Sequence, residues 1–193
     1  MTGRLASRIG RRLLPRRQRD FMRDENGVTV VEFGLLAVPF FSILGAIIET
    51  SMVFLSGQIL DSAVQDVSRM IRTGQTQQAG LTPEQFKQSV CDRLYGLFKD
   101  CSGLHVEVQV IDSFNAATIS PPVNMACDTG AASCNDWTRP EVYAPGSGSS
   151  IVAVQVYYQW PLILAIDGLG LTNLSGGKHL MGSASVFRNE PFT

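Results

Sequence analysis

Few residues in this 193-residue sequence have types and spacings that could support catalysis or metal binding. The two histidines, His105 and His179, each lie in or beside an alternating, strand-like stretch. Neither has a second ligand at the spacing typical of a metal site. We therefore expect structural or exposed roles for both histidines, and no metal site and no cofactor.

Three short sequences match parts of known functional signatures but lack the required context. Asp128-Thr129-Gly130-Ala131 matches the short aspartic-protease pattern, yet it lies between two cysteines and has no second copy, so a turn is expected there. Neither GLG at 168–170 nor SGGK at 175–178 is a complete phosphate-binding loop. The sequence thus predicts no catalytic residues and no enzyme. An exported hydrolase that uses Asp128 is the alternative from the enzyme class.

The most unusual titratable groups are two glutamates in a long apolar run. The run from Val28 to Leu55 covers about 28 residues, or roughly 42 Å as a helix, and is uncharged from Phe33 to Ile48. A carboxylate in the apolar phase is costly unless it is paired or neutral. Glu49 is expected at the outer boundary of a membrane, where it can be hydrated. Glu32 either marks the inner boundary of the membrane, where it remains hydrated, or has a specific role.

Charge is divided unequally along the chain. Residues 1–27 hold eight of the sixteen basic residues but three of the seventeen acidic ones, which leaves eight basic and fourteen acidic residues beyond. By the positive-inside rule, the Arg-rich segment stays cytoplasmic and the acidic part is exported. A twin-arginine signal at Arg11 and Arg12 is disfavoured by Pro15 and the following charges. A nucleic-acid arm is disfavoured because the chain lacks a cytosolic body, so no nucleic-acid partner is expected.

The predicted membrane helix continues beyond the bilayer as an amphipathic stem. Apolar residues recur every three or four positions with polar residues opposite, and Gly74 after Arg72 is the expected stop. One helix of about 46 residues is therefore predicted. Pro39 removes one backbone hydrogen bond and favours a kink within it. The apolar residues of the stem are Ile59, Leu60, Ala63, Val64, Val67, Met70 and Ile71.

The exported part is predicted to begin with a polar linker at 75–80 and a second helix at about 83–99. Thr82 is the expected N-cap of that helix, and Pro83 is its expected first residue.

Three later stretches have the composition of strands. Residues 104–110 alternate between apolar and polar types, which predicts a half-buried strand. Residues 151–160 are rich in β-branched and aromatic types and predict a central strand, and 179–188 predict a final one. We expect an α+β fold in which a small antiparallel sheet packs on the stem and on the second helix.

All four cysteines, Cys91, Cys101, Cys127 and Cys134, lie in the part expected to be exported, where thiols are oxidised. Four cysteines allow three connectivities, and sequence proximity favours 91–101 with 127–134. The second bridge would fasten the long irregular segment 112–150.

The residues around Gly27 resemble a known processing site. Gly27 followed by Val28-Thr29-Val30-Val31-Glu32-Phe33 resembles the cleavage site of class III type IV prepilins, in which a peptidase cuts after the glycine. The wider segment, NGVTVVEFGLLAVPFFSILGAIIE, is similar to the TadE-like family of tight-adherence (Tad/Flp) pilus proteins. The terminal SASVFRNEPF at 183–192 also resembles the ends of such proteins, whereas the middle of the chain has no such resemblance.

This resemblance implies a three-part organisation. A prepilin-type leader would cover 1–27, a transmembrane helix and stem 28–74, and a pilin-like head 75–193. The peptide bond between Gly27 and Val28 would be cut. In an assembled bundle, the carboxylate of Glu32 would pair with the N-terminal ammonium of a neighbouring subunit and offset the cost of burying both charges.

The resemblance also implies a function and a set of partners. The chain would be a minor pilin or pseudopilin in the assembly, initiation or tip of a pilus for surface adhesion. The implied partners are the prepilin peptidase, other TadE-like or TadF-like pseudopilins, the major Flp pilin, the inner-membrane platform with its motor ATPase, and membrane lipid. The implied location is the bacterial inner membrane, or the extracellular pilus after assembly. The alternative is an uncleaved, membrane-anchored periplasmic binding or adhesion module.

Overall fold

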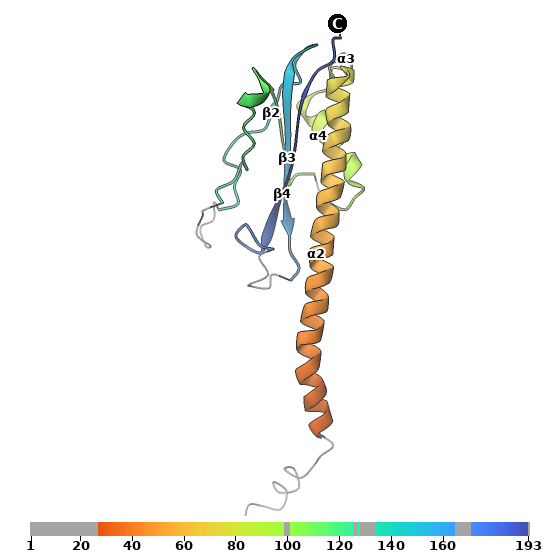
Figure 1. Ribbon diagram of the computed structural model, residues 1–193, viewed down its shortest axis with the longest axis vertical. Helices are drawn as coiled ribbons and strands as arrows, with labels where there is room; N and C mark the ends of the chain where they lie inside the picture. The colour runs from red at the N-terminus through yellow and green to blue at the C-terminus, as the bar shows by residue number, and fades with distance from the viewer. Residues whose placement is uncertain (1–26, 99–100, 126, 128–133, 165–170, 193) are drawn as a thin grey trace, which may run out of the picture. The chain divides into compact units, whose positions relative to one another are not determined.

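The computed structural model describes residues 27–98, 101–125, 127, 134–164 and 171–192 (Figure 1). The chain divides into two compact units, Met1–Leu44 and Gly45–Thr193. Apart from Gly27, the predicted leader lies outside the described residues. The division into 1–27, 28–74 and 75–193 stays a prediction.

The predicted long helix is present as α2 (Val28–Arg72). Gly74 follows it with φ of 78°, a left-handed conformation that glycine adopts at little cost, so the helix ends where the sequence predicts. Pro39 lies inside α2 and does not end it, and a kink there stays a prediction. The expected linker contains a single helical turn, α3 (Gln75–Gln78).

The C-terminal part of α2 buries one face in the core of the second unit. Leu60, Val64, Val67 and Ile71 are almost completely buried, as expected for the apolar face of a stem. Burying each such side chain stabilises the fold by about 1.5–3 kcal/mol. The predicted amphipathic stem is therefore confirmed. The buried residues of α2 are Glu49, Val53, Ser56, Leu60, Ala63, Val64, Val67, Ser68 and Ile71.

Four strands form a sheet in the order β2-β1-β3-β4. β1 (Leu104–Ile111), β3 (Ile151–Pro161) and β4 (Lys178–Arg188) are antiparallel to one another, as predicted. β2 (Val142–Tyr143) pairs parallel to β1. The expected α+β fold is confirmed, and the three predicted strands are antiparallel, whereas the short parallel strand β2 was not predicted because two residues are too few to show an alternating pattern.

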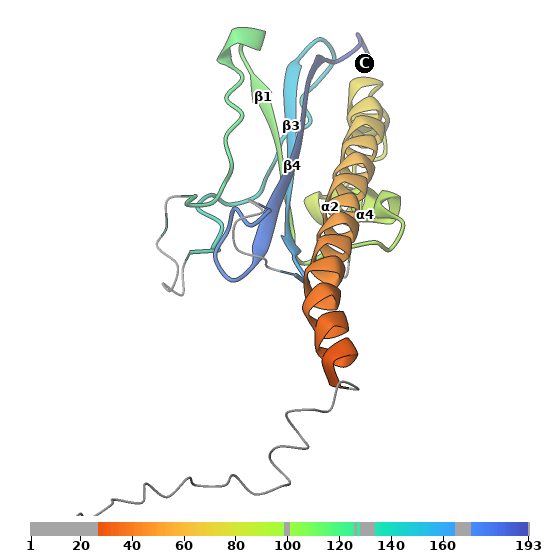
Figure 2. The same ribbon diagram turned by 60° about the horizontal axis from the view of Figure 1, so that its bottom comes forward.

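One face of the sheet packs on the helices. The register of β1 and β3 places Val106 opposite Val156 and Val108 opposite Val154, and these residues join the core that α2 enters. Figures 1 and 2 show α2 along one side of the sheet, with the irregular segment that follows β1 on the other side. That segment includes the short 3₁₀ helix η3 (Phe114–Ala116).

The second helix, α4 (Pro83–Cys91), begins as predicted. The hydroxyl oxygen of Thr82 accepts a hydrogen bond from the backbone N–H of Gln85 at 3.2 Å, and the side chain of Gln85 accepts one from the N–H of Thr82 at 3.0 Å. This capping box fixes the start of the helix. Phe86 and Val90 then fill the core beside α2.

The predicted end of this helix is wrong. α4 ends at Cys91 and is followed by one 3₁₀ turn, η2 (Asp92–Leu94), rather than reaching residue 99. Tyr95 and Gly96 both have positive φ, at 52° and 69°, which is incompatible with a continuing helix.

Both disulfides have the pairing that sequence proximity favours. Cys91 is bonded to Cys101, which ties the end of α4 to the residues before β1. Cys127 is bonded to Cys134 within the irregular segment.

The last described residues, 188–192, form a C-terminal clasp that joins the end of β4 to residues 145–150 of the head and to the end of α2. The side-chain amide of Asn189 donates to the carbonyl oxygens of Pro145 and Ser147, both at 3.0 Å. The backbone N–H of Asn189 donates to the carbonyl of Ser150 at 2.8 Å. Asn189 is buried, so these bonds are protected from water.

The clasp also contacts the end of α2. The N–H of Glu190 donates to the carbonyl of Arg72 at 2.9 Å, which satisfies one of the acceptors that a helix end leaves unpaired. The ring of Phe192 lies against Gly74, where a Cβ would be 2.7 Å from it. The terminal sequence motif therefore has a structural role in this fold.

Leu60→Ala tests the burial of the stem. Leu60 is 1 % exposed, so the substitution leaves a cavity and is expected to lower the free energy of unfolding by about 2–5 kcal/mol. The matched control is Leu55→Ala, at a site that is 50 % exposed on the same helix, with an expected change of about 0.5 kcal/mol or less. Circular dichroism of the detergent-solubilised protein during heating measures both. Equal losses would contradict the assignment of the buried face.

Asn189→Ala tests the clasp. The substitution leaves the carbonyls of Pro145 and Ser147 without their donor and is expected to cost about 1–3 kcal/mol. Amide hydrogen exchange at Glu190 should accelerate, whereas Asn115→Ala, at an exposed site in η3, should leave it unchanged. Unaltered exchange in the Asn189 variant would show that the clasp does not hold the end of α2.

Candidate functional site

The predicted processing site lies at the start of α2. Gly27 directly precedes the helix, and Val28 is its first residue and is exposed. Beyond its chain neighbours, no described atom lies within 4 Å of the position that a Gly27 Cβ would occupy. Within the described part of the first unit, this peptide bond is open to approach. Cleavage there stays a prediction.

Glu32 lies one helical turn beyond Val28, on the same side of α2. Its side chain is exposed, and none of the ion pairs found between described residues involves it. Its pairing with a neighbouring subunit's amine stays a prediction.

The N-terminal part of α2 has an apolar and exposed surface. Within the part of the chain that the structure describes, α2 is the one helix long and apolar enough to cross a membrane. The hydroxyls of Ser42, Thr50 and Ser51 donate to carbonyls four residues earlier, so their polar groups are satisfied within the helix. A helix that is apolar around its circumference needs apolar surroundings, which fits a membrane anchor.

Glu49, at the end of the uncharged run, is 6 % exposed. Its two carboxylate oxygens accept hydrogen bonds from the backbone N–H groups of Ile163, at 2.8 Å, and Leu164, at 2.9 Å. The interpretation of Glu49 as a hydrated residue is therefore wrong. A segment that follows β3, more than 100 residues later in the chain, supplies its donors instead of water.

Gly45, one turn before Glu49, makes room for the same segment. A Cβ at this position would lie 2.5 Å from Cδ1 of Leu164, so a larger residue would displace that side chain. Gly45 and Glu49 lie on one face of α2 and together form what we call the α2 seat. The acid was visible in the sequence, but its partner lies too far along the chain for any local pattern to indicate it.

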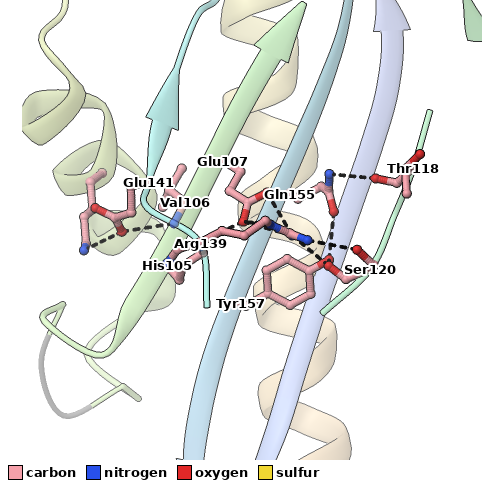
Figure 3. Close-up of polar contacts among 10 residues, drawn as sticks. His105, Val106, Glu107, Thr118, Ser120, Arg139, Glu141, Gln155 and Tyr157 are labelled. Atoms are coloured by element: carbon pink, nitrogen blue, oxygen red, sulfur yellow. Dashed lines mark hydrogen bonds and ion pairs between the residues drawn. The ribbon is translucent and has the colours of Figure 1, made fainter. Parts of the chain in front are cut away.

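A polar cluster, buried at His105 and Glu107 and half-buried at Arg139, connects the other face of the sheet to the irregular segment (Figure 3). Oε1 of Glu107 lies 2.9 Å from Nε2 of His105. The guanidinium of Arg139 donates to both oxygens of Glu107, at 3.0 and 3.1 Å, and to the hydroxyl and carbonyl oxygens of Ser120, both at 2.9 Å. Such a network holds distant segments together through charge-assisted hydrogen bonds.

Two residues of β3 extend the polar cluster (Figure 3). The hydroxyl of Tyr157 lies 2.8 Å from the side-chain oxygen of Gln155 and 3.1 Å from the carbonyl oxygen of Ser120. The side-chain amide of Gln155 donates to the carbonyl of Thr118 at 3.2 Å. Burial, followed by the charge of Glu107, raises the pKa of Tyr157 above its ordinary value, so the hydroxyl remains a donor.

The polar cluster has a structural role. The ring of His105 is buried and stacks on Trp137 with ring centroids 4.6 Å apart, in agreement with the structural role expected for this histidine. The alternating pattern of 104–110 predicted a half-buried strand, whereas Glu107 on its polar side is buried because the irregular segment covers that face of the sheet.

Among the described residues, the other candidates for chemistry form no metal-binding group. Across the described ranges, no three His, Cys, Asp or Glu side chains are grouped so that they could hold a metal ion. Nδ1 of His179 faces the carbonyl oxygen of Leu171. The SGGK sequence forms the turn that leads into β4, with positive φ at Gly176 and Gly177. Asp128 and the GLG sequence lie outside the described residues.

Comparison with known families identifies the N-terminal part of the chain. Residues 27–69 match the family model described as TadE-like protein. No curated protein and no solved structure matches the chain. The matched residues begin at the predicted processing glycine and include most of α2, with Glu32, Pro39 and the α2 seat. The chain thus carries, over residues 27–69, the TadE-like segment that the sequence resemblance predicts.

Proposed function

We propose that this protein is a minor pilin or pseudopilin of the Tad/Flp pilus system, anchored in the bacterial inner membrane. The observation that carries the proposal is that the TadE-like match coincides with α2. The match supports a pilus-associated structural protein, and we assign the chain no catalytic role. The helix would root the protein in the membrane, and the head would act outside it.

The proposed topology places residues 1–27 in the cytoplasm and the head in the periplasm. The eight arginines of the N-terminal segment favour retention on the inner side. Two disulfides in the head are typical of proteins that fold in an oxidising compartment. A prepilin peptidase would then cut between Gly27 and Val28.

Assembly would use the exposed apolar surface of α2 and the carboxylate of Glu32. An exposed glutamate near the end of a membrane helix needs a partner once neighbouring helices surround it. The new N-terminal ammonium on Val28 of a neighbouring subunit has the right charge, and pairing would set the register between the two helices. We expect these neighbours to be the major Flp pilin and other TadE-like or TadF-like pseudopilins. The inner-membrane platform and its motor ATPase would drive their assembly.

Glu32→Ala tests this role. The variant should remain in the membrane fraction at the wild-type level, whereas surface pili should decrease about tenfold or more, because loss of one partner of a buried ion pair costs several kcal/mol and about 1.4 kcal/mol is a factor of ten. The measurement is electron microscopy together with quantitation of sheared pili.

Glu84→Ala is the matched control, since Glu84 is an exposed glutamate at the start of α4 in the head. It should leave both the membrane level and the number of pili unchanged. Normal piliation in the Glu32 variant would rule out the proposed assembly contact.

A further inference from the structure

The segment after β3 presents an exposed apolar side chain beside α2. This tip, Leu162-Ile163-Leu164, contains no charged or polar side chain. Ile163 is 90 % exposed, whereas Leu162 packs against the core and Leu164 lies in the space left by Gly45. The tip is therefore fixed at its two ends and displays one large apolar side chain outward.

Exposed apolar surface continues from the tip along α2. Ile47 and Ile48 precede Glu49 and are exposed, and Phe54 and Leu55 follow it and are exposed as well. Glu49 and Leu55 are about 9 Å apart along the helix axis. Ser51 is also exposed at this level, but its hydroxyl donates to the carbonyl of Ile47 within the helix, so the tip lies at a level of α2 where the other exposed side chains named are apolar.

This level corresponds to the outer boundary of the membrane segment. About 20 residues span a hydrocarbon core of about 30 Å, and a span that begins at Val28 reaches Ile47. Glu49 then lies where the acyl chains meet the headgroups.

At the membrane boundary, the backbone N–H groups of the tip and the carboxylate of Glu49 need hydrogen-bond partners, and the α2 seat provides them. In the absence of water, unpaired backbone N–H groups and an unpaired carboxylate are both strongly unfavourable. The two N–H groups of Ile163 and Leu164 and the two oxygens of Glu49 satisfy one another. Nothing polar in this contact needs to face the lipid.

We propose that the tip inserts Ile163 into the outer leaflet of the same membrane that α2 crosses. The occupant of this surface is lipid, because the α2 seat holds the tip at the membrane boundary and the exposed surface there is apolar on both elements. Apolar side chains at an interface bury several ångströms into the boundary between headgroups and acyl chains. The head then has a second membrane contact and a fixed orientation on the membrane. This inference goes beyond the proposed function, but it depends on α2 crossing the bilayer.

Site-specific labelling of the full chain in vesicles tests the proposal. All four native cysteines are in disulfides, so Ile163→Cys introduces one reactive thiol for the fluorophore NBD. The matched control is Ile119→Cys, at an isoleucine of the head that is 57 % exposed. Phe41→Cys in α2 reports membrane insertion of the helix itself. The vesicles contain phosphatidylethanolamine and phosphatidylglycerol, with nitroxide-labelled lipid as one quencher and aqueous iodide as the other.

The expected result is that nitroxide lipid quenches the probe at position 163, and that iodide quenches it several-fold less than the probe at 119. Equal iodide quenching at 163 and 119, with position 41 protected, would overturn this proposal alone. Iodide access at both 163 and 41 would overturn the membrane anchor and this proposal together. Protection at 163 that disappears as the ratio of lipid to protein is raised would assign the tip to a neighbouring subunit, and would also overturn the proposal.

Discussion

Burial of one face of α2 beneath the sheet is the interaction on which the head depends. Leu60, Val64, Val67 and Ile71 belong to the same core as the central valines of β1 and β3. Without them, the sheet would expose a wide apolar face to water, which is unfavourable at about 25 cal/mol per Å². The same helix provides the apolar surface that fits a membrane anchor. The head is therefore not an independent domain attached by a tether, because part of its core belongs to the proposed membrane helix.

Contacts at two levels of the stem hold distant segments against α2. At Glu49, the α2 seat binds the backbone that follows β3. At Arg72 and Gly74, the C-terminal clasp covers the end of the helix. The disulfide between Cys91 and Cys101 holds the shorter connection between α4 and β1. Because these contacts hold the head against α2 at both levels, a displacement of the stem would also move the head. The proposed function, in which a subunit is moved during pilus assembly, needs such a connection.

The sequence predicted the parts of the fold that local patterns determine. The apolar period predicted the long helix, and Gly74 predicted its end. The capping-box residues predicted the start of α4, and alternation or β-branched composition predicted three strands. Three differences from the predictions have tertiary causes. β2 exists because it pairs with β1, Glu107 is buried because Arg139 and Ser120 reach it, and Glu49 is satisfied by a segment that no local pattern links to it. At the predicted processing site, a local motif indicated the candidate residues, but the proposed pairing between subunits cannot be read from one chain.

We propose above all that cleavage between Gly27 and Val28 creates a pilin-type N-terminus at Val28. Mass spectrometry of the N-terminal peptide and of the intact protein, purified from the membrane of the source bacterium, tests it most directly. The membrane form is expected to begin at Val28, and the Gly27→Leu variant, which has a bulky side chain at the cut, is expected to keep residues 1–27. A wild-type membrane form whose N-terminus lies before Gly27 would contradict the account and favour an uncleaved, anchored module.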